Sequence, residues 1–235
     1  DAITRTRMRR IEGLFATFPR LVRDLSAELG KQVFVELENG EVELDREMIE
    51  LIRDPLLHII RNAVDHGIEK PSDRLKAGKR EIGLLTVTAR QSGNQILIHI
   101  EDDGRGIDGG RLVEKAIASG SVDKAEAGQM TAREQLALIF EPGLSTAKEV
   151  TAISGRGVGM DVVRSNVERI GGIVEVDSRL GEGTRMTLRV PLTLTIIPAL
   201  TVSAVVAVRP DLVHGARAAV WTNRVNPPLA AARPE

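Results

Sequence analysis

The sequence predicts an α+β fold: a two-layer α/β sandwich in which helices cover one face of a mixed, mostly antiparallel sheet. Segments that alternate apolar and polar residues occur in pairs, and stretches with helical periodicity separate these pairs. Paired strands favour antiparallel neighbours, whereas a doubly wound parallel sheet would require strands and helices to alternate singly. The chain contains no internal repeat.

Two long segments have the periodicity of helices that pack on a sheet. Apolar residues three and four apart predict a helix over 7–29, in which Pro19 is a candidate kink and Gly30 a C-terminal cap. The same spacing predicts a second helix over 46–66, with Pro55 marking a bend or a break. Each helix has one apolar side, which we expect to be buried.

Strands are expected in pairs, and shorter helices and loops lie between them. The predicted strand pairs are 33–37 with 42–44, 84–89 with 95–101, and 173–177 with 184–190. Asn39-Gly40 is a strong signal for a hairpin turn within the first pair. Helices are expected over 111–118, 132–140 and 160–170, and polar or glycine-rich loops over 69–80, 102–110, 120–128 and 141–159.

The composition excludes several classes of function. A formal charge of −1 gives no electrostatic reason to expect nucleic acid or membrane as a partner. Aromatic residues make up 2% of the chain, which disfavours base stacking, and the absence of cysteine excludes disulfides and thiolate nucleophiles. The apolar stretch 192–208 is interrupted by Pro198 and is short for a membrane span. We expect a cytoplasmic protein without direct membrane insertion.

The end of the second predicted helix has an unusual polar side. His58, Asn62 and either Asp65 or His66 lie three or four residues apart, and Arg61 lies beside them. We interpret this side as the floor of a nucleotide site. The amide oxygen of Asn62 is a ligand type suited to Mg²⁺, and His58 could hold a phosphate, support the metal or accept a proton. Taken alone, each is more often an ordinary helix-face residue.

A glycine-rich turn follows the strand predicted over 95–101. In Asp103-Gly104-Arg105-Gly106 the glycines allow the backbone to approach a ligand closely. The carboxylate of Asp103 could accept a hydrogen bond from the exocyclic amine of adenine. An acidic surface turn explains this motif equally well when it is considered alone.

A second glycine-rich motif directly precedes the helix that begins near Met160. Gly155-Arg156-Gly157-Val158-Gly159 would place free backbone amides at a helix N-terminus, where they can bind phosphate. Ser145 and Thr146 could add hydroxyl donors to the same phosphates. A flexible loop and a solvated turn are the alternatives for these two segments.

The motifs together resemble a known family. HIIRNAVDHGIE, EDDGRGID, FEPGLSTA and GRGVGMDVV are similar to the N, G1, F and G2 boxes of the GHKL ATPase superfamily, and most similar to its branch of CheA-type chemotaxis histidine kinases. The resemblance covers about residues 7–200. It implies a Bergerat-type sandwich over 5–191 that binds ATP and Mg²⁺ under a lid at about 104–158. Residues 192–235 would be a junction and an atypical tail.

The resemblance also implies roles for individual residues. Asn62 matches the Mg²⁺-binding asparagine, and His58 stands where related ATPases place the glutamate that activates water. Asp103 matches the adenine-reading aspartate, with Gly104 and Gly106 shaping its pocket. The remaining matches are phosphate-binding or box positions: Arg61, Asp65, His66, Ser145, Thr146, Gly155, Gly157, Val158, Gly159 and Met160.

The function implied is transfer of the γ-phosphoryl group of ATP to a histidine on a separate phosphoacceptor domain. The family's full-length members act as homodimers that couple to chemoreceptors and adaptors and that serve a response regulator indirectly. No segment here resembles the phosphoacceptor or dimerisation domain, and 203–235 does not read as a coupling domain. A GHKL-type ATPase that drives a clamp and a non-catalytic nucleotide-gated module are the two alternatives.

Overall fold

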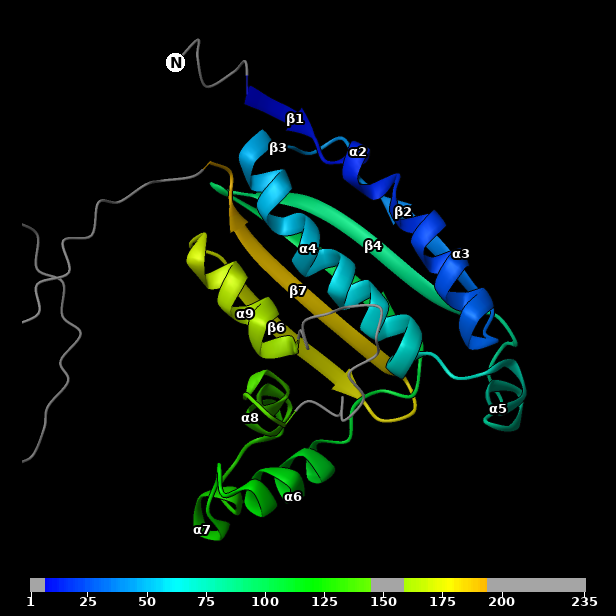
Figure 1. The fold of residues 1–235 in the computed structure, drawn as a ribbon, viewed down its shortest axis with the longest axis vertical. Helices are drawn as coiled ribbons and strands as arrows, with labels where there is room; N and C mark the ends of the chain where they lie inside the picture. Colours follow the sequence, from blue (N-terminus) through cyan, green and yellow to red (C-terminus); the bar gives the residue numbers. More distant parts are fainter. Residues whose placement is uncertain (1–6, 145–158, 194–235) are drawn as a thin grey trace, which may run out of the picture. The chain divides into compact units, whose positions relative to one another are not determined.

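The computed structural model describes residues 7–144 and 159–193, and in this part of the chain a mixed sheet forms one layer (Figure 1). The sheet has five strands in the order β2-β4-β5-β7-β6. The strands are β2 (Val33–Glu38), β4 (Gly83–Ser92), β5 (Gln95–Asp102), β7 (Gly183–Pro191) and β6 (Ile173–Arg179). β2 and β4 are parallel, and the other neighbours are antiparallel. The predicted two-layer α+β fold is confirmed.

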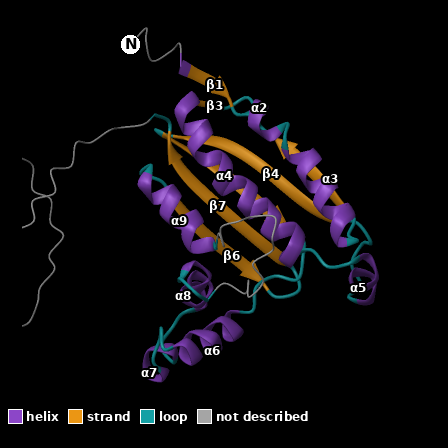
Figure 2. Ribbon diagram, in the orientation of Figure 1, coloured by secondary structure: helices purple, strands orange, loops and turns teal. Residues whose placement is uncertain are grey.

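Helices α3 (Phe18–Leu29), α4 (Arg46–Asn62) and α9 (Met160–Arg169) lie over one face of this sheet (Figure 2). Between β5 and α9 the chain adds a second group: α6 (Gly109–Ser119), α7 (Lys124–Ala127), α8 (Ala132–Ala137) and the 3₁₀ turn η2 (Leu138–Phe140). This group has its own small apolar cluster, formed by Leu112, Ala116, Val122, Leu138 and Leu144. It occupies part of the region predicted to be a lid.

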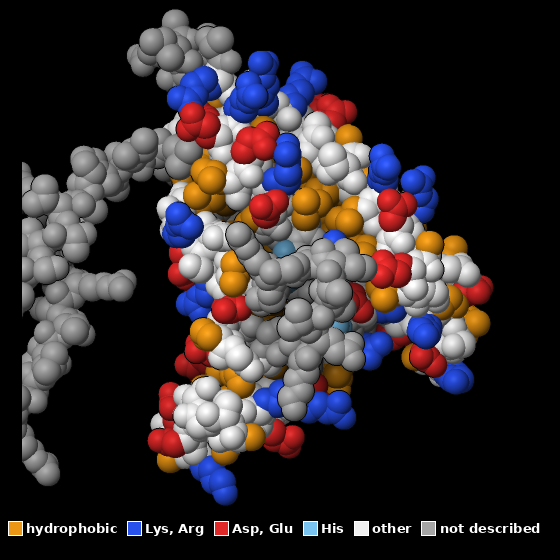
Figure 3. Space-filling view, viewed as in Figure 1, with side chains coloured by type: hydrophobic (Ala, Val, Ile, Leu, Met, Phe, Trp, Pro, Cys, Tyr) orange, Lys and Arg blue, Asp and Glu red, His pale blue; other side chains and the backbone are white. Residues whose placement is uncertain are grey.

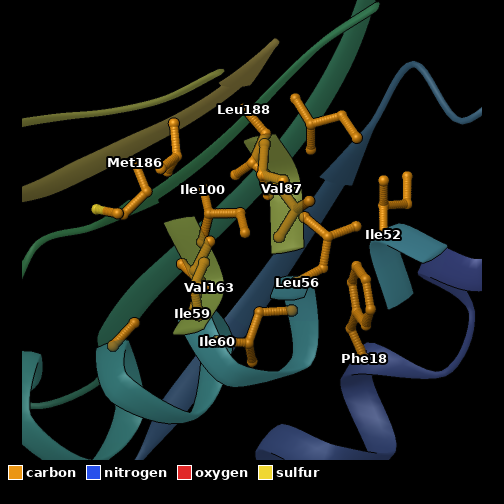
Figure 4. Packing of buried hydrophobic residues seen from close by; sticks show 14 of the residues in the cluster. Phe18, Ile52, Leu56, Ile59, Ile60, Val87, Ile100, Val163, Met186 and Leu188 are labelled. Atoms are coloured by element: carbon orange, nitrogen blue, oxygen red, sulfur yellow. The ribbon is translucent and has the colours of Figure 1, made fainter. Parts of the chain in front are cut away.

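The core between the two layers is organised around α4. Leu56, Ile59 and Ile60 project from this helix toward the strands, where they meet Val87 and Ile100 (Figure 4). Each of these side chains is at most 2% exposed. Burial of a Leu or Ile side chain is worth about 1.5–3 kcal/mol, so this stripe fixes the rotation of α4 about its axis. The polar side of the helix is thereby directed away from the core.

The single helix predicted over 7–29 is wrong in its first half. The chain instead forms β1 (Met8–Arg10), a short helix α2 (Glu12–Phe15) and then α3. Pro19 occupies the first turn of α3, where its missing N–H is tolerated, so the helix begins anew there. Gly30 ends α3 with φ +64°, as predicted for the C-terminal cap.

The hairpin predicted around Asn39-Gly40 is also wrong. Asn39 does turn the chain, with φ +57°, but the strands on either side of it diverge. β2 pairs with β4, while β3 (Glu43–Asp45) pairs antiparallel with β1. The turn signal is therefore real, and the partners of the two strands are set by distant segments.

Helix α4 runs through the buried Pro55 without ending there, and it is held at both ends. At its start, the side chain of Asp45 accepts a hydrogen bond from the amide of Glu47 at 2.8 Å. The amide of Asp45 donates to the carbonyl of Leu192 at 3.2 Å, which ties the chain beyond β7 to the same point. At its end, α4 passes into a π-helical turn, η1 (Ala63–Gly67).

Candidate functional site

A cavity of about 560 Å³ opens between α4, the end of β5, β7, α6 and α9. Its walls are mainly aliphatic, with Ile59, Ile100, Ile107, Leu144 and Met186 among the lining residues. Figure 3 shows this helix-covered side of the molecule, where Lys and Arg side chains gather beside the α6 segment. Polar and charged side chains complete the lining, and a concave site with apolar walls and placed polar groups is the usual form of a small-molecule site.

The polar side of α4 and η1 lines this cavity. His58, Asn62 and His66 recur at intervals of four residues, and all three face the cavity. Arg61 and Asp65, which were expected at the site, are not among the residues that line it. The side chains at 58, 62 and 66 therefore form the floor, and His66 is the member of the pair 65/66 that completes it.

The surroundings of His58 favour one protonation state, and the surroundings of Asn62 favour one orientation of its amide. Burial, reinforced by the neighbouring Arg61, lowers the pKa of His58 below its usual value, so its imidazole is neutral at pH 7. The side-chain amide of Asn62 donates to the sulfur of Met160 at 3.1 Å. A thioether only accepts hydrogen bonds, so this contact turns the amide oxygen of Asn62 away from Met160.

The adenine-reading aspartate expected at position 103 is not at the cavity, and Asp102 is there instead. Buried side chains of β5 alternate along Ile98, Ile100 and Asp102, which puts Asp102 on the inner face. Asp103 points outward: one of its oxygens accepts from the amide of Leu84 at 2.9 Å. Its other oxygen accepts from Arg74 at 2.8 Å. The aspartate that faces the cavity is therefore Asp102, one residue before the predicted Asp103. The alternation of side chains along β5 determines which of these two adjacent aspartates points inward.

Asp102 is a buried carboxylate at one end of the cavity. Burial raises its pKa to about 6, although hydrogen bonds from the amides of Gly104 and Thr184 act in the opposite direction. The bond from Gly104 measures 2.9 Å. Above pH 6 the side chain is ionised and accepts hydrogen bonds only.

The two glycines predicted in this turn, Gly104 and Gly106, are required because other backbone segments pack directly against them. A Cβ at Gly104 would overlap the carbonyl of Gly67, at the end of η1. Gly106 has φ +70°, and a Cβ there would overlap the carbonyl of Arg179. The turn is thus pressed against the end of η1 on one side and the end of β6 on the other.

The cavity has two distinguishable ends along α4. Gly67 packs next to the carboxylate of Asp102, whereas His58 lies nine residues earlier in the same helical segment. A rise of 1.5 Å per residue separates these points by roughly 13 Å along the helix axis. A ligand that reached from Asp102 to His58 would have about the length of an extended nucleotide.

Three cations that line the cavity were not anticipated. Arg111 and Lys115 lie four residues apart on α6, and Arg105 lies in the turn before it. Their signal in the sequence is the spacing of 111 and 115 on a predicted helix, which places both side chains on one side. Asp102 and Asp108 also line the cavity, and Asp108 pairs with Arg111 at 3.5 Å, so the charge of the three cations is partly balanced there.

The second glycine-rich motif is described only at its end. Gly159 is the N-cap of α9 and makes no side-chain capping bond, and Met160 is the first residue of the helix and lines the cavity. The backbone N–H groups of this first turn point toward the N-terminal end of the helix. Ser145, Thr146, Gly155, Gly157 and Val158 lie outside the described residues.

A sequence profile of the family described as histidine kinase-, DNA gyrase B- and HSP90-like ATPase matches residues 52–194. The chain belongs to this family. The match begins within α4 and extends to the end of β7, so it contains every element that lines the cavity. Membership in this family of ATPases implies that the chain binds ATP.

Several curated relatives are named as CheA proteins of chemotaxis. The chain is 51% identical over 201 residues to the sensor histidine kinase CheAY of Helicobacter pylori, which covers 86% of this chain and 25% of that protein. It is 46% identical over 202 residues to the chemotaxis protein CheA of Salmonella typhimurium, covering 86% and 30%. The chain therefore spans less than a third of either relative.

A solved structure with a similar fold is the catalytic domain of the histidine kinase ThkA. The two share 17% identity with a TM-score of 0.45, over 79% of this chain and 94% of that one. This likeness is too distant to support an argument about function. Within the described ranges, no helix has the length and apolar character needed to cross a bilayer.

Proposed function

We propose that residues 5–191 are the ATP–Mg²⁺-binding catalytic domain of a chemotaxis histidine kinase. It transfers the γ-phosphoryl group of ATP to a histidine on a separate phosphoacceptor domain. The observation that carries the proposal is the arrangement of polar groups along the cavity: the buried carboxylate of Asp102 lies beside Gly67 at the end of η1, and Asn62 and His58 line the cavity five and nine residues earlier on the same helical segment. Residues 192–235 supply a junction and at most the start of a coupling domain.

Asp102 is the residue that reads the base. Its ionised carboxylate, among aliphatic walls, accepts a hydrogen bond from the exocyclic amine of adenine. Guanine carries a carbonyl oxygen at the corresponding position, which would meet the carboxylate as a second acceptor. A buried unpaired acceptor costs about 1–3 kcal/mol, so this contact favours adenine over guanine.

Asn62 fits a Mg²⁺ ion that is held mainly by phosphates and water. Among the residues that the structure describes, no group of three or more His, Asp or Glu side chains could enclose a metal. Mg²⁺ commonly takes only one or two protein oxygens, and the amide oxygen of Asn62 is such a ligand. When bound, the ion would neutralise charge on the phosphates. Neutral His58 is better suited to donate to a phosphate oxygen than to ligate a hard cation.

The phosphates would extend from Asn62 toward α6 and α9. Arg111 and Lys115 supply cations there, and the first turn of α9 after Gly159 supplies backbone donors. Such a cradle positions the phosphates and stabilises negative charge, which is most of what a phosphoryl-transfer enzyme contributes.

The partner's imidazole is the nucleophile in the transfer step. Its nitrogen lone pair attacks the γ-phosphorus, an N–P bond forms, and the bond from phosphorus to the β,γ-bridging oxygen breaks. ADP leaves with that electron pair, and the imidazole releases its proton to solvent. No residue of this chain needs to activate water, which agrees with the absence of a carboxylate at position 58.

The partners of the whole protein follow from the relatives' names and are part of the proposal. We infer a phosphoacceptor histidine domain, a response regulator reached through it, and coupling to chemoreceptors and adaptors in the full-length protein. That protein would be a cytoplasmic homodimer. Nucleic acid is not among the expected partners.

The proposal is tested with labelled ATP and the phosphoacceptor domain of a CheA relative. We expect acid-labile phosphate on that domain, and we expect Asn62→Asp to lose most of the transfer because it alters the charge at the metal. ATP binding without any transfer would sink the kinase claim. Steady ATP turnover without an acceptor would favour the alternative ATPase.

A further inference from the structure

A buried arginine outside the cavity is not explained by the site as described so far. Arg74 lies on the short helix α5 (Pro71–Lys76), in a segment that the sequence indicates only as a polar loop. It is 1% exposed, which is rare for an arginine unless every donor finds a partner. α5 lines no part of the cavity.

The guanidinium of Arg74 is directed at the turn that follows Asp102. Its Nη2 donates to the carboxylate of Asp103 at 2.8 Å, and its Nη1 donates to the Asp103 carbonyl at 3.2 Å. Nη1 also pairs with Glu69 at 3.0 Å, and Nε donates to the carbonyl of Arg80 at 2.8 Å. The arginine thereby joins the segment after η1 to the turn after β5.

Lys79 completes this cluster from the loop after α5. Its ammonium donates to the carbonyl of Asp103 at 3.0 Å and to the carbonyl of Gly104 at 2.6 Å. A third bond, to Glu69 at 2.9 Å, balances the charge of the lysine. Two cations therefore hold two consecutive carbonyl oxygens of the turn.

These carbonyls belong to the same short backbone segment that holds the base-reading carboxylate. The amide of Gly104 donates to Asp102, while the carbonyl of Gly104 is held by Lys79. The next amide, that of Arg105, donates to the carbonyl of Gly67 at 2.9 Å. A small rotation of this segment would change the direction of the Asp102 carboxylate.

We propose that Arg74 and Lys79 form a latch that positions Asp102 for base recognition. They are positioning residues, because they act through the backbone of the turn and do not touch the cavity. A buried ionic cluster adds little net stability compared with apolar packing, but it fixes geometry through directional bonds. This inference rests on the proposed function, since it assigns the latch to the adenine end of the ATP site.

The test compares Arg74→Lys and Lys79→Met with Lys76→Met, a matched control. Lys76 lies on the same helix, is 78% exposed and pairs only loosely with Asp73 at 3.7 Å. Arg74→Lys keeps the charge but loses the forked geometry. Lys79 is 17% exposed, so its substitution by a residue of similar length is the variant more easily tolerated by the fold.

Three quantities are measured: the Kd for ADP by calorimetry, the constant for inhibition of phosphoryl transfer by inorganic tripolyphosphate, and the rate of amide exchange at Gly104 and Arg105. We expect the two latch variants to weaken ADP binding about tenfold, as loss of one charge-assisted bond predicts, with tripolyphosphate unchanged. Amide exchange at Gly104 and Arg105 should accelerate in both latch variants. In the Lys76→Met control, exchange at these two amides should stay unchanged.

Two outcomes would overturn the latch. One is unchanged ADP affinity and unchanged exchange at Gly104 in folded Lys79→Met. The other is equal weakening of ADP and tripolyphosphate, which would indicate a general loss of structure. If the unsubstituted chain bound no ADP, the proposed function would fail, and the exchange of Gly104 and Arg105 would still decide whether the latch holds the turn.

Discussion

At the scale of single residues, Asp102 is subject to two opposing effects. Burial favours its neutral form, whereas the proposed recognition of adenine uses its ionised form. Burial raises its pKa from 3.8 to about 6, so the folded protein holds this proton more tightly than the unfolded chain. Its contribution to stability is therefore fully present below pH 3.8 and is lost as the pH rises through 6. Two pKa units correspond to about 3 kcal/mol that the ionised carboxylate costs at neutral pH.

The substitution Asp102→Asn should separate the effect of this carboxylate on stability from its effect on nucleotide binding. The free energy of unfolding of the variant relative to the unsubstituted protein should rise by about 3 kcal/mol between pH 3.5 and pH 7.5, since the neutral amide does not ionise. ADP binding should weaken at least about tenfold, because a charged acceptor is lost. Urea unfolding at both pH values and calorimetry check these effects. A stability difference that does not change with pH would contradict the account of Asp102.

Met160 is expected to act on the metal site through Asn62. Met160→Leu keeps the volume but removes the sulfur that accepts from the Asn62 amide. Without that partner the amide is free to turn, and the Mg²⁺ concentration needed for half-maximal nucleotide binding should rise on the order of tenfold, as for other residues that orient a ligand. Calorimetric titration of Mg²⁺ at fixed ADP checks this.

The matched control is Met48→Leu, at a fully buried methionine that lies on α4, the helix that carries Asn62, but does not line the cavity. It should leave the Mg²⁺ midpoint unchanged. An equal midpoint for Met160→Leu and the unsubstituted chain would show that Met160 does not orient Asn62.

At the scale of elements, the π-helical turn η1 is where α4 meets the base end of the cavity. Its extra residue per turn is closed by the bond from the Ile68 amide to the carbonyl of Ala63 at 2.8 Å. Lys31, just after α3, caps it: its ammonium donates to the carbonyl of Val64 at 2.8 Å and also to that of Asp65. Helix α3 is thereby tied to the floor of the site.

Lys31→Met should loosen this turn. We expect a loss of about 1–2 kcal/mol in the free energy of unfolding, since bonds from a charged donor to two carbonyls are lost at a partly exposed position. Exchange of the Ile68 amide should accelerate as well. The control variant is Lys70→Met, because Lys70 is an exposed lysine that lies shortly after η1 in the sequence. Unchanged Ile68 exchange in Lys31→Met would contradict the capping role.

The elements that the sequence predicted well are those with a long apolar stripe. Helices α4 and α9 and the strands β4, β5, β6 and β7 all carry local periodicity that the fold preserves. The same local alternation along β5 distinguishes Asp102 from Asp103, a distinction that motif spacing alone did not make. Arg74 could not be found in this way, because its burial depends on Glu69 and Asp103, which no local pattern links to it.

At the scale of the whole molecule, the site depends on pairings that are distant in sequence. β2 joins the sheet by parallel pairing with β4, across a segment that contains α4 and α5. β7 lies beside β5, so Thr184 comes to face Asp102 across some eighty residues. Local turn signals such as Asn39-Gly40 carry no information on these pairings. For this reason the residues at the cavity were predictable mainly as motifs, and their arrangement was not.

The central claim is that Asp102 and the His58–Asn62 side of α4 bind opposite ends of one ATP molecule. A crystal structure with a non-hydrolysable ATP analogue and Mg²⁺ tests this most directly. We expect the Asp102 carboxylate within hydrogen-bond distance of the adenine amine and the Asn62 amide oxygen facing the metal. A base bound at Asp103, or phosphates bound away from Asn62, would contradict the account.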